Sequence, residues 1–185
     1  MIIDSSSLII IAKLNRLELL SNLYKEIILT QGIYQETVEE GITTNAPDAK
    51  LIEKAVQNKN IRIIELSLKY SEFSGELQNT YCQLGRGEAD AIALALQEKQ
   101  KRIVMDEKFG RQVCKLYKIK PIGTLRVILE VYNSSIIKEQ ELKDIIKGMI
   151  ESKFRIGADV IIEFWDMFEK LKKRKKVSIS YSNKH

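Results

Sequence analysis

Two aspartates follow short apolar runs, and their placement suits metal chemistry. Asp4 follows residues 1–3, and Asp106 follows residues 102–105. Short apolar runs of this kind are typical of buried strands in a parallel sheet. Ligands of open parallel sheets bind outside the carboxyl ends of the strands. We therefore expect both aspartates to project from the same edge of one sheet.

Two glutamates are expected to join this edge. Glu88 opens a predicted helix after the turn at residues 85–87, and Glu36 lies on the helix that follows the predicted strand 27–30. Helices of a doubly wound fold begin at the edge where the preceding strands end. The sequence thus predicts three or four carboxylates converging at one edge.

Carboxylates that converge require a counter-charge, because neighbouring negative charges and burial both raise the pKa of an acid. Mg²⁺ and Mn²⁺ prefer oxygen ligands and retain sites for water and substrate phosphate. Such ions can activate water and stabilise a leaving oxyanion. The only histidine is His185, the last residue, which argues against a Ser-His-Asp triad, a histidine base and a histidine-rich zinc site.

Each acid also has a structural interpretation. An aspartate after a strand often caps the next helix, although Ser5–Ser7 could cap this one and leave Asp4 without a structural role. Glu88 and Asp90 lie in a first helical turn, where the helix dipole favours acids by about 0.3–1 kcal/mol each. Glu36 could belong to a solvated face. Only the convergence of the acids distinguishes a site from these alternatives.

The composition is that of a globular chain of 185 residues, with 44% apolar and 30% charged residues. We find no secretory leader pattern and no apolar run of the roughly 18 residues needed to span a bilayer. We expect a cytoplasmic protein that does not enter a membrane. Two cysteines, Cys82 and Cys114, are expected to be reduced thiols.

The net charge of +5 is concentrated near the C-terminus. Six of the basic residues lie between Lys170 and Lys176, and without them 24 basic residues face 25 acidic ones. A run of this kind can bind phosphate backbones by counterion release. It is equally typical of a solvated helix end.

Strands and helices alternate along the chain with short connections. This order predicts an α/β fold of three layers, with a central parallel sheet between helices and extra helices at the C-terminus. We expect a core at residues 1–135, C-terminal helices packed on it at 136–175 and a flexible basic tail at 176–185. The predicted strands are residues 1–3, 27–30, 61–66, 102–105 and 120–122, and the predicted helices begin near residues 5, 17, 32, 47, 69, 88, 109, 124, 137 and 159. We expect Gly41 to stop the helix that begins at residue 32, and the last helix to end at residue 173.

Several segments resemble the PIN-domain family. The opening Ile2-Ile3-Asp4-Ser5-Ser6-Ser7-Leu8-Ile9 is similar to the start of PIN domains, and three further segments match in order and spacing. With Ile122-Gly123-Thr124, they resemble a little-characterised prokaryotic branch related to VapC-type toxins. The three segments are Ile33 to Val38, Gly87 to Ala95 and Ile103 to Arg111.

The resemblance implies a PIN-like fold and metal-dependent endoribonuclease cleavage of single-stranded RNA, with Mg²⁺ or Mn²⁺ as cofactor. It places catalytic acids at Asp4, Glu36, Glu88 and Asp106, and metal ligands at Asp4, Glu88 and Asp106. It also implies RNA and a possible cognate antitoxin as partners, and we separately expect a homodimer.

Five further positions are candidate members of the site. Ser6 stands where the family often has a small polar residue that steadies the first acid. Asp90 and Glu107 are doubtful members of the site, since Asp90 points about 200° away from Glu88 around a regular helix. Arg86 and Arg111 could contact phosphate, or could be ordinary surface charges.

One position departs from the family pattern. Many relatives have threonine two residues before the fourth-strand acid, where this chain has Val104. We therefore expect the support for Asp106 to differ from the family's.

Three other functions remain open. A phosphatase of the haloacid dehalogenase type also starts with a strand and an aspartate, but it needs a second acid where this chain has Ser6. A nucleic-acid-binding PIN-like module with weak or lost catalysis is the main alternative. The chain could also act chiefly as a toxin held by an antitoxin, with the aromatic C-terminal helices either covering the sheet or forming the interface.

Overall fold

The computed structural model describes residues 1–182, and their side chains through residue 175. The chain forms two compact units, Met1–Val127 and a second unit from Ile128 onward. The division falls inside helix α9 (Thr124–Asn133), whereas the predicted boundary at 135/136 falls after it. The predicted tail, residues 176–185, lies outside the residues whose side chains are described.

The first unit contains a five-stranded sheet in the order β3-β2-β1-β4-β5, with every neighbouring pair parallel. Ile2 and Ile3 of the central strand β1 are fully buried. All five predicted strands are present, although β3 ends at Ile64 rather than residue 66. The strands are β1 (Ile2–Ile3), β2 (Ile27–Thr30), β3 (Ile61–Ile64), β4 (Arg102–Val104) and β5 (Lys120–Ile122).

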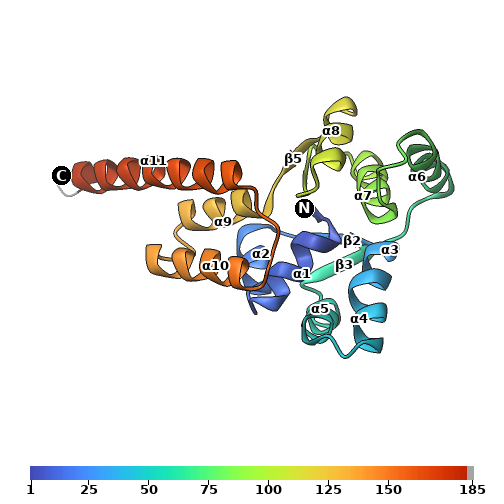
Figure 1. The fold of residues 1–185 in the computed structure, drawn as a ribbon, viewed down its shortest axis with the longest axis horizontal. Helices are drawn as coiled ribbons and strands as arrows, with labels where there is room; N and C mark the ends of the chain where they lie inside the picture. Colours follow the sequence, from blue (N-terminus) through green and yellow to red (C-terminus); the bar gives the residue numbers. More distant parts are fainter. Residues whose placement is uncertain (183–185) are drawn as a thin grey trace. The chain divides into compact units, whose positions relative to one another are not determined.

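Helices cover both faces of this sheet (Figure 1). Right-handed crossovers place α1, α2 and α5 on one face, and α7 and α8 on the other. Contacts of α1 with α2 and α5, and of α7 with α8, agree with this arrangement. The first unit is therefore the predicted three-layer α/β/α fold. Its helices are α1 (Ser5–Lys13), α2 (Leu17–Leu23), α3 (Gln31–Tyr34), η1 (Gln35–Glu39), α4 (Glu40–Thr43), α5 (Pro47–Gln57), α6 (Leu68–Thr80), α7 (Arg86–Gln97) and α8 (Lys108–Leu116).

The helix predicted to stop at Gly41 continues to Thr43. Gly41 has a different role: a Cβ atom there would lie 2.6 Å from the Cβ of Ala49 in α5. The glycine allows two helices to approach closely, and the helix ends two residues later. The middle of this helical segment, Gln35–Glu39, adopts π-helical hydrogen bonding, a feature often found at functional sites.

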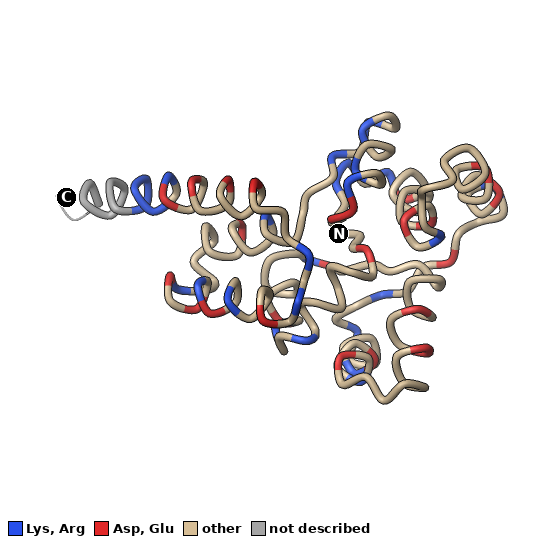
Figure 2. The backbone as a smooth tube through the Cα atoms, in the orientation of Figure 1, with Lys and Arg blue, Asp and Glu red and all other residues tan. Residues whose placement is uncertain are grey.

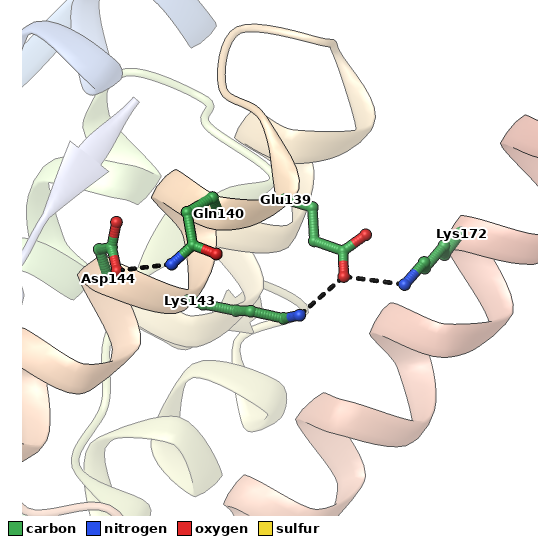
Figure 3. Close-up of polar contacts among 5 residues, drawn as sticks. All are labelled: Glu139, Gln140, Lys143, Asp144 and Lys172. Atoms are coloured by element: carbon green, nitrogen blue, oxygen red, sulfur yellow. Dashed lines mark hydrogen bonds and ion pairs between the residues drawn. The ribbon is translucent and has the colours of Figure 1, made fainter.

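The second unit contains the end of α9, α10 (Glu139–Glu151) and α11 (Ala158–Ser182). The Phe168 ring packs against Tyr132 of α9, with ring centroids 5.1 Å apart. Glu139 of α10 accepts hydrogen bonds from Lys143 and from Lys172 of α11, each at 2.8 Å (Figure 3). These contacts hold the three helices of this unit to one another.

Helix α11 extends to Ser182, beyond the predicted end at residue 173. No glycine or proline follows within the helix, and lysine and arginine are good helix formers. Over the described residues 1–182, no helix has the length and hydropathy needed to cross a bilayer.

Candidate active site

Asp4 caps helix α1, at the point where β1 ends. Its Oδ1 accepts the backbone N–H of Ser7 at 2.9 Å, and the side chain is only 3% exposed. The interpretation that the serines cap this helix without Asp4 is therefore wrong. The aspartate both satisfies a helix N-terminus and carries a buried carboxylate. The Ser6 hydroxyl, 3.3 Å away, donates to its Oδ2.

Asp106 lies beside Asp4, just beyond the end of β4. The backbone N–H of Asp106 donates to Oδ2 of Asp4 at 3.2 Å. Burial raises the pKa of Asp4 to about 6; the hydrogen bonds from Ser7 lower it, and the nearby Asp106 charge raises it further. The structure thus joins two of the predicted acids into one pair at the carboxyl edge of the sheet.

Three donors hold the Asp106 carboxylate in place. The Ser7 hydroxyl donates to Oδ2 at 2.8 Å, and the Thr124 hydroxyl donates to the same oxygen at 2.5 Å. The Thr124 backbone N–H donates to Oδ1 at 3.0 Å. Ser7 and Thr124 are fully buried. Support for Asp106 therefore comes from α1 and the start of α9, since Val104 cannot provide it.

Gly123 makes this arrangement possible. A Cβ atom there would lie 2.8 Å from Oδ1 of Asp106 and 3.5 Å from Nη1 of Arg111. Sequence reasoning missed the roles of Ser7, Gly123 and Thr124. The sequence did carry a signal for Gly123 and Thr124. They directly follow the last strand, so the helix that begins at Thr124 starts at the same carboxyl edge of the sheet as the acids.

Glu88, on the first turn of α7, belongs to a second group of acids, which also contains Glu36 and Glu107. Its Oε2 accepts the Gly85 N–H at 2.7 Å. Its Oε1 is buried and has no hydrogen-bond partner among the described residues. A Cβ atom at Gly110 of α8 would lie only 2.6 Å from that oxygen. Burial raises the pKa of Glu88, the Gly85 hydrogen bond lowers it, and the charges of Glu107 and Glu36 raise it.

Glu36 is exposed and projects from the π-helical segment η1. A Cβ atom at Gly87 would lie 3.2 Å from Oε2 of Glu36 and 3.7 Å from the Ser5 hydroxyl. Glu36 therefore lies against the first turn of α7 and near the first residue of α1, next to Asp4. Through Gly87 and Ser5, Glu36 therefore lies on the side of α7 that faces the start of α1.

Asp90 is directed away from these acids. It is almost buried, and its Oδ1 accepts the Ser74 hydroxyl of α6 at 2.6 Å. A Cβ atom at Gly32 would lie 2.7 Å from its other oxygen, Oδ2. In this structure Asp90 links α7 to α6 and α3.

The remaining predicted residues lie at the rim. Glu107 is exposed at the N-cap of α8, and Arg86 is exposed at the start of α7. Arg111 is half-buried and donates from Nη1 to the Met105 carbonyl at 2.9 Å. Arg111 thus helps to hold the turn that carries Asp106.

The chemical type of the candidate ligands suits a hard cation, since every one of them is a carboxylate oxygen. The buried Asp4 carboxylate and the partnerless Oε1 of Glu88 are the groups that a cation would relieve. Within the described residues, however, no three His, Cys, Asp or Glu side chains are placed to hold one ion. The structure provides a pair, Asp4 and Asp106, with Glu88 turned toward Gly85.

The first unit is an open parallel α/β domain, a class of fold that binds its ligands outside the carboxyl ends of the strands, and Asp4 and Asp106 lie at that edge. Residues 1–170 match a family model described as DUF3368: PIN domain, and the chain belongs to the PIN-domain family. PIN domains are generally nucleases and typically use divalent metals. No curated protein matches the chain, and no solved structure does.

Proposed function

We propose that this chain is a divalent-metal-dependent endoribonuclease that hydrolyses phosphodiester bonds of single-stranded RNA. The observation that carries the proposal is the Asp4–Asp106 pair, with a direct hydrogen bond between the two residues at 3.2 Å. Family membership supports nuclease chemistry, and RNA as the substrate comes from the resemblance to VapC-type toxins.

Asp4 and Asp106 would hold the cation, with Glu88 as a third ligand. A bound Mg²⁺ or Mn²⁺ would supply Lewis acidity and lower the pKa of water near the phosphate. Asp4 binds a cation only when deprotonated. Ser7 and Thr124 fix the orientation of Asp106, because their hydroxyls converge on its Oδ2. Glu36 borders the site near Ser5.

Other groups of the chain can position the substrate. The N-terminus of α7, with Arg86 in its first turn, offers a positive dipole end that favours phosphate. Arg111 remains a candidate phosphate contact through guanidinium donors that do not serve Met105.

A cleavage assay tests the proposal. The full chain is incubated with fluorescent single-stranded RNA and Mn²⁺, alongside Asp4→Asn and Asp106→Asn purified in the same way. We expect cleavage by the wild-type protein and a loss of at least about 100-fold in either variant, since each removes a ligand and its charge. Equal cleavage by wild type and both variants would show a contaminating nuclease or a different site.

A nucleic-acid-binding module with weak or lost catalysis is the second candidate. One observation favours it: Glu88 is engaged by the Gly85 N–H and completes no three-acid site in the described residues. A ligand that binds only the native state raises its apparent stability. An unchanged melting temperature in millimolar Mn²⁺, together with tight RNA binding and no cleavage, would favour this candidate.

The toxin role, a cognate antitoxin, a homodimer and a cytoplasmic location belong to the same proposal, and the first two derive from the resemblance. Expression from an inducible promoter should arrest growth, and Asp4→Asn should relieve the arrest. Size-exclusion chromatography with light scattering tests the homodimer. Growth that is unaffected by wild-type expression would contradict the toxin role without affecting the nuclease assignment.

A further inference from the structure

Four aromatic side chains cluster where α6 meets α8. Tyr81 packs edge-to-face against Phe109, with ring centroids 6.2 Å apart, and Phe73 packs in the same manner against Tyr117 at 5.3 Å. The two pairs adjoin each other: burial raises the pKa of Tyr117, and the neighbouring Tyr81 side chain raises it further. The four rings therefore form one connected aromatic cluster, made of Phe73, Tyr81, Phe109 and Tyr117.

The cluster is not part of the buried core. All four residues are half-buried, although aromatic rings of this size gain most stability from complete burial. Leu116, beside Tyr117, is 66% exposed. Aromatic surface is thus left open to solvent at one place on the first unit.

This aromatic surface borders the candidate active site. Phe109 precedes Gly110 in the chain. A Cβ atom placed on Gly110 would lie 2.6 Å from Oε1 of Glu88, so Gly110 packs directly against that oxygen. On the other side, Tyr81 begins the short turn to Gly85, whose N–H donates to Oε2 of Glu88. Both rings are therefore anchored by segments that contact the same carboxylate.

Basic side chains lie near the rings, on α8 and directly after it. Lys108, Lys115 and Lys118 are exposed, and Figure 2 shows lysine and arginine along α8. Arg86 is also exposed, one residue after Gly85. Half-exposed aromatic rings flanked by basic side chains suit unpaired nucleotides, because bases stack on the rings while phosphates meet the cations.

We propose that Tyr81 and Phe109 form a stacking surface for an unpaired base of the RNA, beside the phosphate that lies at the carboxylates. This inference rests on the proposed function, and it specifies how the substrate is recognised. Stacking tolerates every base, since each has a π-face. The surface therefore selects single strands over duplexes, whose bases are already stacked and paired.

Binding by the full chain tests this surface separately from cleavage. Fluorescence anisotropy is measured in Ca²⁺ with a short single-stranded RNA, the same strand carrying abasic nucleotides, and a duplex. The variants Tyr81→Leu and Phe109→Leu keep apolar volume but lose the ring. Tyr70→Leu is the matched control, because Tyr70 is a half-buried tyrosine on α6 outside the cluster.

We expect Tyr81→Leu and Phe109→Leu each to weaken single-strand binding by about 5- to 100-fold, the equivalent of one lost base stack. Phe109→Tyr should retain wild-type affinity, and Tyr70→Leu should change it less than twofold. The abasic strand should bind wild type and Tyr81→Leu equally, because a missing base removes the partner that the ring would contact. A purely structural role of the ring would weaken binding of both strands alike.

Equal affinity of the wild-type protein for the normal and abasic strands would overturn the inference, as would an equal loss of affinity in Tyr70→Leu and Tyr81→Leu. A chain that prefers duplex, or that binds no RNA, would also overturn it. If base-dependent binding is found while Asp4→Asn cleaves like wild type, the stacking surface stands and the proposed catalytic site fails.

Discussion

Asp4 combines a structural and a chemical role in one side chain. It caps α1, and its burial raises its pKa to about 6. The native state therefore holds the proton more tightly than the unfolded chain does. Without metal, we expect the contribution of Asp4 to stability to fall as the pH rises from about 4 to about 6, by on the order of 3 kcal/mol, and not to recover above that range; Asp4→Asn should lack this change.

Mn²⁺ competes with this proton. We expect the Mn²⁺-induced rise in melting temperature to be small at pH 5 and to grow through about pH 6 to a plateau near pH 7.5. Thermal denaturation with and without Mn²⁺ measures it. Asp4→Asn, which cannot titrate, should lack the step. An equal Mn²⁺ effect at pH 5 and pH 7.5 would contradict the assignment of Asp4 as a ligand.

Thr124 should support Asp106 through its hydroxyl. Thr124→Val keeps the shape and the backbone N–H but removes one donor to a charged oxygen, and we expect a loss of about 1–2 kcal/mol in the free energy of unfolding, with reduced cleavage. Thr124→Ser should restore both, as measured by urea denaturation and the RNA assay. Wild-type activity in Thr124→Val would show that the Ser7 hydroxyl alone positions Asp106.

At the residue scale, the sequence predicted the Asp4–Asp106 pairing because both acids follow strands whose direction fixes where they point. It did not predict the donors to Asp106. Ser7 and Thr124 are separated from it by 99 and 18 residues, and only strand order brings them together. Glu88 turns toward Gly85 through a short local hydrogen bond, which the pattern of acids does not reveal.

At the scale of elements, glycines allow helices to approach the acids. Gly110 in α8 and Gly75 in α6 are both helical glycines, but a Cβ atom at Gly110 would lie 2.5 Å from Sδ of Met105 and 2.6 Å from Oε1 of Glu88. At Gly75 nothing lies within 4 Å of that position. Helix propensity alone would make alanine favourable at both positions.

We therefore expect opposite effects from the same substitution. Gly110→Ala should destabilise the protein by about 1–3 kcal/mol through overpacking, and it should reduce cleavage by displacing Glu88. Gly75→Ala should stabilise it by about 0.5–1 kcal/mol and leave cleavage unchanged. Urea denaturation of the two variants measures the difference. If both variants gain stability, the close approach of α8 to Glu88 is wrong.

The elements themselves were largely predictable. Alternating apolar runs and short connections indicated the parallel sheet, and all five strands are present. The end of the helix at Gly41 was predicted wrongly. In the sequence, a glycine that is needed for close helix packing cannot be told from a glycine that ends a helix. The π-helical turn at Glu36 has no known signature in periodicity, since it depends on packing around it.

At the scale of the whole molecule, the basic residues of the C-terminal run fall into two groups, those with partners inside the second unit and those exposed to solvent. Lys172 pairs with Glu139, and Lys175 donates to the Tyr132 carbonyl and the Ser135 hydroxyl. These two lysines hold helices of the second unit together. Three exposed residues, Lys170, Lys173 and Arg174, share the opposite side of α11. In Figure 2 the described part of α11 changes from acidic to basic toward its C-terminus.

This exposed trio should contact RNA phosphates without regard to sequence. Its triple substitution by glutamine should weaken single-strand binding and lower the slope of log K against log salt concentration by about 2, as expected for three lost phosphate contacts. A salt titration of RNA binding measures the slope. Substituting Lys50, Lys54 and Lys59, exposed lysines in and just after α5, gives the same charge change and should leave the slope unaltered. Equal slopes for both triple variants would assign the run to a solvated helix end.

The sequence located the charge excess but not its division, because only the helix packing decides which lysines find partners. It likewise predicted a core with C-terminal helices, while the structure divides the chain inside α9. A continuous helix gives no sequence signal of a division within it.

The position of a bound Mn²⁺ ion tests the central claim most directly. Crystals of the full chain are soaked in Mn²⁺ at pH 7.5, above the raised pKa of Asp4, and the anomalous signal of manganese locates the ion. We predict an ion bound by carboxylate oxygens of Asp4 and Asp106, with Glu88 released from Gly85 to approach it. Manganese bound elsewhere, with these two aspartates unchanged, would contradict the assignment of the active site.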